Sequence, residues 1–214
     1  MKVAAQQPHF LPWPPYWHKV LEADVFLLWS GVDYSKGEYI NRVRHAGSWL
    51  TLPVTAQLGQ PIHDVVIAKE QRRLIKIAKT VDQVRGKYRS RLDEVVELLH
   101  HIQPGDNLAA VNSDLLRAVI KALGRSPSVF MAAPLRVTEG SKTERLRKLL
   151  DTYTPGVKVY LTGIGARNYL HAGLLNCEVW WQDISRFDPE MSILQLIANE
   201  PDPVDYILTT GGWA

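Results

Sequence analysis

The feature that most restricts the fold of this chain is the run Asp24–Trp29, DVFLLW, which is apolar after its first residue. A short apolar run of this length is typical of a strand buried on both faces, and such strands occur mainly in parallel sheets covered by helices. A strand candidate at Lys2–Gln6 and two possible helical turns at Tyr16–Ala23 precede it. A strand, a short helix and a second strand in this order predict a parallel βαβ unit.

Helical periodicity marks the middle of the chain. Apolar residues recur every three or four positions from Leu74 to Leu99, which predicts a helix with one apolar face. Gly86 is the expected place for a break or kink in this helix. A second helix is expected to end near Leu123. The sequence therefore predicts a helical insert or subdomain around residues 70–124.

Strand and helix patterns alternate again after this insert. Ser141 and Glu144 have the spacing of a capping box, and Ser192 is a candidate N-cap. The sequence predicts a single α/β domain over residues 1–214, with a mainly parallel sheet flanked by helices. The remaining expected elements are strands at 48–54, 62–68, 129–135, 157–161 and 178–182, and helices at 141–153 and 192–199.

Several classes of protein are excluded by what the chain lacks. The single cysteine, Cys177, cannot form an internal disulfide or a cysteine-based zinc site alone. No run of about 18 apolar residues is present, and the apolar stretch before Gln6 is too short for a signal peptide. Neither a His-Glu-x-x-His pair nor a Gly-x-Ser-x-Gly elbow occurs. We therefore expect a cytoplasmic protein that does not associate with membranes and has neither metal nor cofactor.

The first candidate functional cluster follows the first expected strand. Gln7 and His9 offer hydrogen bonds and Trp13 offers a stacking face, in a loop stiffened by prolines. Open α/β sheets bind ligands at the carboxyl ends of their strands, where this loop is expected to lie. The alternative is a rigid corner with buried aromatic rings and a hydrogen-bonded histidine.

A second cluster follows the DVFLLW strand, and its members approach the same edge of the predicted sheet. Lysine and arginine side chains near one loop make an anion clamp. The alternative is a solvated hairpin edge, where such charges prevent aggregation. The cluster consists of Tyr34, Lys36, Asn41, Arg42 and Arg44.

Two further clusters precede or open helices. Lys142 and Thr143 lie at the start of the capped helix, where backbone N–H groups attract anions, although the Gly-Lys-Ser/Thr order of a phosphate loop is absent. Gly163 and Gly165 follow an expected strand and allow close approach of a ligand, and Arg167 can contact a phosphate. The alternatives are a plain capping box and a tight turn.

The charge of the insert is strongly uneven. Residues 69–91 hold nine Lys and Arg against Glu70 and Asp82, a balance of +7. Most of these cations fall opposite the apolar face of the predicted helix. The Lys69–Arg91 face is therefore a possible DNA-binding surface, and its alternative is an ordinary solvated helix face.

The clusters together resemble the WbqC-like protein family. The opening QQPHFLPWPPYWHKVLEADVFLL and the segment VDYSKGEYINRVR resemble its N-terminal blocks, and SKTERLRKLL, YLTGIGARNYL and FDPEMSILQLIANE resemble its C-terminal blocks in the same order. Two acidic residues common in the family are replaced here by Ser30 and Gly31, so a metal or acid/base role assigned to them does not carry over. Gln6 stands where a histidine is common, and Pro15 where a glycine is common.

This resemblance implies a cytoplasmic protein of bacterial or phage origin with a transferase role. It implies transfer of an amino acid such as glycine to an amino sugar of surface polysaccharide, or to a modified pyrimidine in phage DNA. We expect Lys36, Arg42, Arg44, Lys142 and Arg167 to bind phosphate groups. We expect Gln7, His9, Tyr34 and Asn41 to orient the acceptor or move a proton, with His9 as the base because its ordinary pKa lies near neutrality. The alternatives are a nucleotidyltransferase-like enzyme and a binding protein without turnover.

Overall fold

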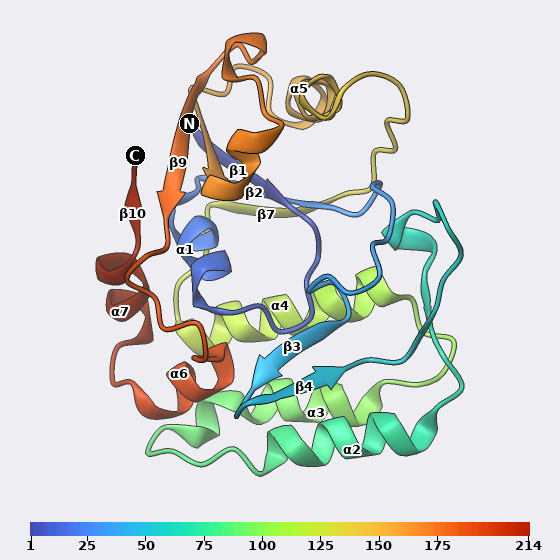
Figure 1. Ribbon diagram of the computed structural model, residues 1–214. Coiled ribbons are helices and arrows are strands. Elements are labelled where there is room, and N and C mark those ends of the chain that lie inside the picture. Colours follow the sequence, from blue (N-terminus) through green and yellow to red (C-terminus); the bar gives the residue numbers. More distant parts are fainter.

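The computed structural model describes all 214 residues and contains a six-stranded sheet (Figure 1). The strand order is β10-β9-β8-β1-β2-β7, and every pair is parallel except β9 and β10. The α/β class, with a mostly parallel sheet flanked by helices, is thereby confirmed. The strands are β1 (Lys2–Gln6), β2 (Val25–Trp29), β7 (Val129–Ala133), β8 (Val159–Gly163), β9 (Glu178–Asp183) and β10 (Gly212–Trp213).

The predicted βαβ unit forms the centre of this sheet. Helix α1 (Pro14–Glu22) connects β1 to β2, and Val3 pairs with Val25 in parallel register. Helix α1 begins two residues before the helical turns expected at Tyr16–Ala23. Pro14 and Pro15 open α1, because the first turn of a helix does not need their N–H groups and proline already has a helical φ.

The chain changes direction across the sheet between β1 and β8. From β1 the chain adds β2 and β7 on one side, and then it crosses back to add β8 and β9 on the other. In open α/β sheets such a reversal leaves a crevice at the carboxyl ends of the two central strands. The loops after Gln6 and Gly163 lie at this point.

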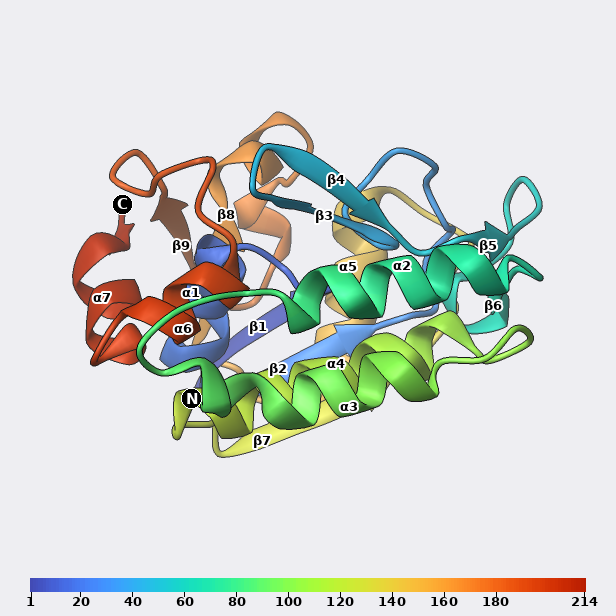
Figure 2. The ribbon, with the colours of Figure 1, turned by 90° about the horizontal axis from the view of Figure 1, so that it is seen from below.

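The insert is helical, and the helix expected over 74–99 is broken around Gly86, where a break or kink was expected. The structure has α2 (Gln71–Asp82), the 3-10 helix η2 (Arg89–Leu92), α3 (Asp93–His101) and α4 (Leu108–Leu123), and α2 and α3 pack side by side (Figure 2). The break is enforced at Gly86, where an added Cβ would lie 2.2 Å from the carbonyl oxygen of Ala198. Tyr88 N–H donates to the same oxygen at 2.8 Å. A tertiary contact therefore stops a helix whose apolar periodicity continues.

The two strands expected between the sheet and the insert are shorter than predicted. An antiparallel hairpin joins β3 (Arg42–His45) to β4 (Ser48–Thr51), and a second small pair joins β5 (Val54–Thr55) to β6 (Val66–Ile67). Pro53 interrupts the expected strand 48–54, and the 3-10 turn η1 (Ile62–Asp64) replaces the start of the strand expected at 62–68.

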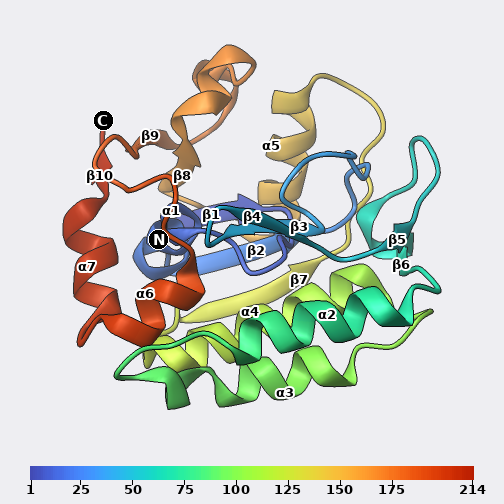
Figure 3. The ribbon, with the colours of Figure 1, turned by 60° about the horizontal axis from the view of Figure 1, so that its bottom comes forward.

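The C-terminal helices cover both faces of the sheet. The predicted capping box at Ser141 opens α5 (Lys142–Tyr153). The predicted N-cap Ser192 opens α6 (Ile193–Asn199), and Gln195 completes a capping box there. Helix α7 (Pro203–Thr210) was not anticipated from the sequence. Figure 3 shows α5 on one face and the insert on the other, and two apolar cores lie on these faces. None of the helices has the length and apolarity that a membrane crossing requires.

Candidate functional site

The loop after β1 is held in one shape by aromatic side chains of α1. The hydroxyl group of Tyr16 donates to the carbonyl oxygen of Gln7 at 3.1 Å, and Nε1 of Trp17 donates to that of Pro12 at 2.7 Å. Trp13, half-buried, is the N-cap residue of α1. The loop therefore presents Gln7 and His9 from a fixed backbone at the carboxyl end of β1.

His9 is packed between two tyrosines. Its ring centroid lies 5.3 Å from that of Tyr16 and 6.2 Å from that of Tyr39. Burial, together with the positive charge of Lys19, lowers the pKa of His9 to about 3. The imidazole is thus neutral at pH 7 and a weak proton acceptor, so the expectation of a base with a near-neutral pKa does not hold.

The low pKa values of His9 and His18 predict a loss of stability in mild acid. Burial lowers them to about 3 and about 4 from an ordinary value of 6.5, so below pH 6.5 the unfolded chain binds protons that the folded chain does not. The free energy of unfolding should therefore fall with pH from 6.5 toward 4, by about 1.4 kcal/mol per pH unit for each histidine. Urea titrations from pH 7 to 4.5 should show this slope, and His9→Gln should reduce it by about half. An unchanged slope in His9→Gln contradicts the assignment.

The second predicted cluster forms a bonded group beside the first. The hydroxyl group of Tyr34 donates to Oδ1 of Asn41 at 3.0 Å, and Nδ2 of Asn41 donates to the carbonyl oxygen of Leu52 at 2.8 Å. Burial raises the pKa of Tyr34, which keeps its hydroxyl protonated. Asn41 is therefore engaged in holding the loop, with its amide facing Tyr34.

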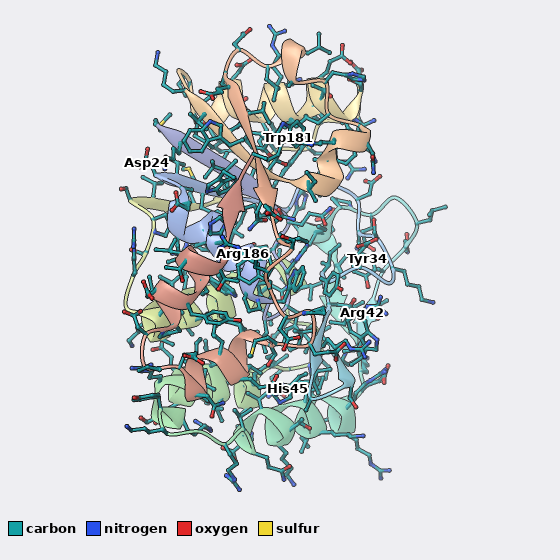
Figure 4. The ribbon with its side chains drawn as sticks, turned by 60° about the vertical axis from the view of Figure 1, so that its left-hand side comes forward. Asp24, Tyr34, Arg42, His45, Trp181 and Arg186 are labelled. Atoms are coloured by element: carbon teal, nitrogen blue, oxygen red, sulfur yellow. The ribbon has the colours of Figure 1, made fainter.

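Arg42 projects from β3 next to this pair. Its guanidinium group lies 4.2 Å from the ring centroid of Trp49 and donates to the carbonyl oxygen of Gly37. Its Nε is buried and has no hydrogen-bond partner in the protein. A buried donor without an acceptor is costly, so a ligand acceptor would stabilise this arrangement. Tyr34 and Arg42 lie on the same flank in Figure 4.

Side chains of this cluster line a cavity of about 400 Å³. Lys36 and Arg42 line it, and α2 adds Arg73, which the sequence placed on the Lys69–Arg91 face and not in this cluster. Glu70, the one carboxylate in the lining, pairs with Arg73 at 3.2 Å. Three cations against one anion leave the cavity positively charged. The full lining is Tyr34, Lys36, Gly37, Asn41, Arg42, Thr51, Leu52, Pro53, Val54, Ala56, Glu70 and Arg73.

A buried asparagine ties the first two clusters together. Nδ2 of Asn112, on α4, donates to the carbonyl oxygens of Pro8 at 2.8 Å and Ile40 at 2.7 Å. The backbone N–H of Phe10 also donates to the carbonyl oxygen of Tyr39 at 3.2 Å. Asn112 is completely buried. The loop of Gln7 and His9 therefore lies directly against the segment that carries Lys36 and Arg42.

The other predicted cations do not join this group. Arg44 does not line the cavity: it forms an exposed ion pair with Glu190 at 3.1 Å, and its guanidinium group lies 5.9 Å from the ring centroid of Trp49. Lys142 lies 4.6 Å from the ring centroid of Tyr169, and Arg167 lies 5.2 Å from that of Trp181. Figure 4 shows Trp181 well apart from Tyr34 and Arg42. The expected convergence of five cations on one anion is thus not found, because α5 and the β3–β4 hairpin pack on opposite faces of the sheet.

Thr143 and the two glycines have different surroundings. Thr143 is fully buried, and its hydroxyl donates to the carbonyl oxygen of Tyr169 and accepts from the N–H of His171, so it has no free donor for a substrate. It ties α5 to the loop after β8. Gly163 and Gly165 lie in open space, since an added Cβ at either would have no heavy atom within 4 Å. The two glycines therefore leave room for a ligand at the end of β8.

The Lys69–Arg91 face is shorter than its sequence suggests. Arg89 pairs with Asp82 at 3.0 Å and with Asp93 at 2.8 Å, and Arg91 stacks on Tyr88 at 4.3 Å. These residues follow the break after α2, so they do not continue its exposed face. The cations that remain on one helix are Arg72, Arg73, Lys76 and Lys79.

Comparison with known proteins identifies a family. The sequence profile of the WbqC-like protein family matches residues 7–204. The uncharacterized protein Rv1507c of Mycobacterium tuberculosis is 27% identical over 225 residues, covering 92% of this chain and 93% of its own length. No solved structure is significantly similar.

Proposed function

The chain belongs to the WbqC-like protein family, and we propose that it is a transferase that acts on a phosphorylated or nucleotide-activated substrate. The observation that carries the proposal is the positive cavity lined by Lys36, Arg42 and Arg73. Arginine guanidinium groups bind phosphate oxygens through paired N–H donors, and a lysine adds a point charge. The volume of about 400 Å³ is in the range of small-molecule sites.

The position of the cavity supports group transfer more than simple binding. The segment that carries Lys36 and Arg42 lies against the loop of Gln7 and His9 at the carboxyl end of β1, where open α/β sheets place their reactive groups. A phosphate held by Arg42 would place the rest of a substrate toward this loop. We propose an amino acid as the transferred group, and an amino sugar or a modified pyrimidine of DNA as the acceptor. With the pyrimidine acceptor, the amine of the amino acid forms a C–N bond and loses a proton as the C–O bond to phosphate or pyrophosphate breaks. With the amino sugar, the sugar amine forms an amide with the carboxyl carbon of the amino acid and loses a proton, as the phosphate or nucleotide that activates this carboxyl group leaves.

Loss of Arg42 should weaken nucleotide binding. Arg42→Gln removes a guanidinium group from the lining, and a charge-assisted hydrogen bond of about 1.5–3 kcal/mol corresponds to a fall in affinity of about tenfold or more. Calorimetric titration with uridine and adenosine diphosphates should show this loss. Arg125→Gln is the matched control, because Arg125 is exposed and lies near Asp24, at the amino ends of the central strands and away from the cavity. Equal affinities in the wild type and Arg42→Gln would reject the proposed phosphate site.

A specific observation favours DNA as the acceptor. Strand β4, which carries the exposed Trp49, lies beside α2 (Figure 2). A second pocket is lined by Trp49 together with Arg73 and Lys76 of α2. Cations next to an exposed aromatic ring suit a polynucleotide, whose phosphates and bases they contact together. A small nucleotide-sugar does not need this additional surface.

Binding to duplex DNA should weaken steeply with salt. Each phosphate contact contributes a slope of about −0.9 in a plot of log affinity against log salt concentration. The double variant Arg72→Gln/Lys79→Gln should reduce the slope by about two, as measured by fluorescence anisotropy of a labelled duplex. Affinity for the duplex that is independent of salt, or unchanged in the double variant, would favour the amino sugar as the acceptor.

Two other outcomes would replace the transferase proposal. Release of pyrophosphate from ATP would indicate a nucleotidyltransferase, and ligand binding without any turnover would indicate a binding protein.

A further inference from the structure

The ammonium group of Lys19, on α1, lacks a counter-ion in the protein. Lys19 is 8% exposed, and its Nζ has one hydrogen-bond partner, Oε1 of Gln6 at 2.6 Å. No carboxylate lies within 4.0 Å of Nζ, and the ring centroid of Tyr16 is 6.0 Å away. Buried lysines are normally paired with an opposite charge because desolvation of the cation is costly. The charge of this lysine is therefore not balanced by any group of the protein.

An unfilled position adjoins this group at the switch between β1 and β8. Gly163 pairs with Gln182 of β9, and the register that pairs Ala4 with Leu161 brings Gln6 level with Gly163. Gln6 and Gln182 both reach α1, through Nζ of Lys19 and the carbonyl oxygen of Pro15 at 2.7 Å. Between them, an added Cβ at Gly163 would have no heavy atom within 4 Å. We call this space the Gly163 gap.

The local electrostatics favour an anion at this position. Burial lowers the pKa of Lys19 to about 8, so the amine remains mostly protonated at neutral pH. His9, whose pKa is lowered by burial and by the charge of Lys19, is neutral. The first turn of α1 contains Pro14 and Pro15, which have no N–H groups to offer an anion. Lys19 therefore provides the positive charge next to the Gly163 gap.

We propose that Lys19 and Gln6 bind an oxyanion group of a ligand, a carboxylate or a phosphate, in the Gly163 gap. Two N–H bonds of the ammonium group are left after the bond to Gln6, and these donate to the anion. As a statement about the substrate, the inference rests on the proposed function. The anion site itself does not depend on the cavity around Arg42.

The test is the thermal unfolding of the full chain with inorganic phosphate or glycine at constant ionic strength. We expect either phosphate or glycine to raise the Tm of the wild type until a plateau is reached. A response to phosphate identifies the oxyanion as a phosphate group, and a response to glycine identifies it as a carboxylate. Lys19→Met should unfold at the same or a higher temperature without the anion, because a buried unpaired charge is lost. It should bind the anion at least tenfold more weakly.

Gly163→Val tests the gap without removing the charge. Gly163 has φ −74° and ψ 150°, which any residue adopts, and its surroundings are open, so valine should leave the Tm within a few degrees of the wild type. It should nevertheless abolish the response to the anion. Lys148→Met, which replaces an exposed lysine of α5, should respond like the wild type.

The proposal is overturned if neither anion changes the Tm of the wild type, or if Lys19→Met and Gly163→Val respond as the wild type does. Arg42→Gln separates a failure of this proposal from a failure of the proposed function. This variant should bind the nucleoside diphosphate at least tenfold more weakly, and its Tm should still rise with the small anion as in the wild type. Nucleotide binding that survives in Arg42→Gln would reject the phosphate cavity and leave the Lys19 site supported.

Discussion

Asn112→Asp should destabilise the protein by about 3–5 kcal/mol, the range found when a buried charge is left without a partner. The substitution keeps the shape of the side chain but replaces the amide that donates to the carbonyl oxygens of Pro8 and Ile40. A carboxylate would then face two carbonyl oxygens in a fully buried position. Urea unfolding at pH 7 measures the loss, and Asn176→Asp, in an exposed loop, is the matched control.

The same substitution should weaken nucleotide binding in the protein that remains folded. Asn112 contacts no residue of the cavity lining directly, but it holds the segment of Lys36 and Arg42 against the loop of His9. We therefore expect affinity for a nucleoside diphosphate to fall together with stability. Destabilisation with unchanged affinity would show that the two loops do not need each other to form the site.

Gly31→Ala should cost about 3 kcal/mol of unfolding free energy, at the upper end of the usual cost of overpacking. An added Cβ would lie 2.0 Å from the carbonyl oxygen of Leu135 and 2.6 Å from that of Pro134. Both atoms belong to the backbone, so no side-chain rotation relieves the clash. The N–H of Ser30 donates to the carbonyl oxygen of Ala133 at 3.3 Å, which keeps these segments in contact.

Thermal or urea unfolding measures the Gly31→Ala effect against Gly173→Ala, whose added Cβ meets no atom within 4 Å. Stability equal to that of the control would show that the ends of β2 and β7 separate more easily than their contact implies. The close approach also explains why no side chain with an acid/base role can stand at position 31.

The elements that could be predicted from the sequence are those determined by local patterns. The apolar run of β2 and the segments before it predicted the βαβ unit, the capping box at Ser141 forms as its spacing requires, and Ser192 is the N-cap of α6 as expected. Gly86 marked the place where the helical pattern over 74–99 breaks, but the periodicity did not show that α2 and α3 pack side by side. The contact of Gly86 with Ala198, over a hundred residues later, leaves no mark in a short window of sequence.

The candidate site shows the same division. Gln7, Lys36 and Gly163 could be proposed because they follow strands, and the carboxyl ends of parallel strands meet at one edge. Lys19, Arg73 and Asn112 lie on helices, where a polar residue is usually exposed, and only packing shows which of them face the site. The topology also could not show that α5 lies on the face opposite the hairpin. This placement separates Lys142 and Arg167 from Arg42.

The most direct test of the phosphate-binding cavity is a crystal structure of the protein with a bound nucleoside diphosphate. We predict that phosphate oxygens lie within hydrogen-bond distance of the Arg42 guanidinium group, including its buried Nε, with Lys36 and Arg73 around the same anion. Phosphate density beside Lys142 and Arg167, with the cavity around Arg42 empty, would contradict the account.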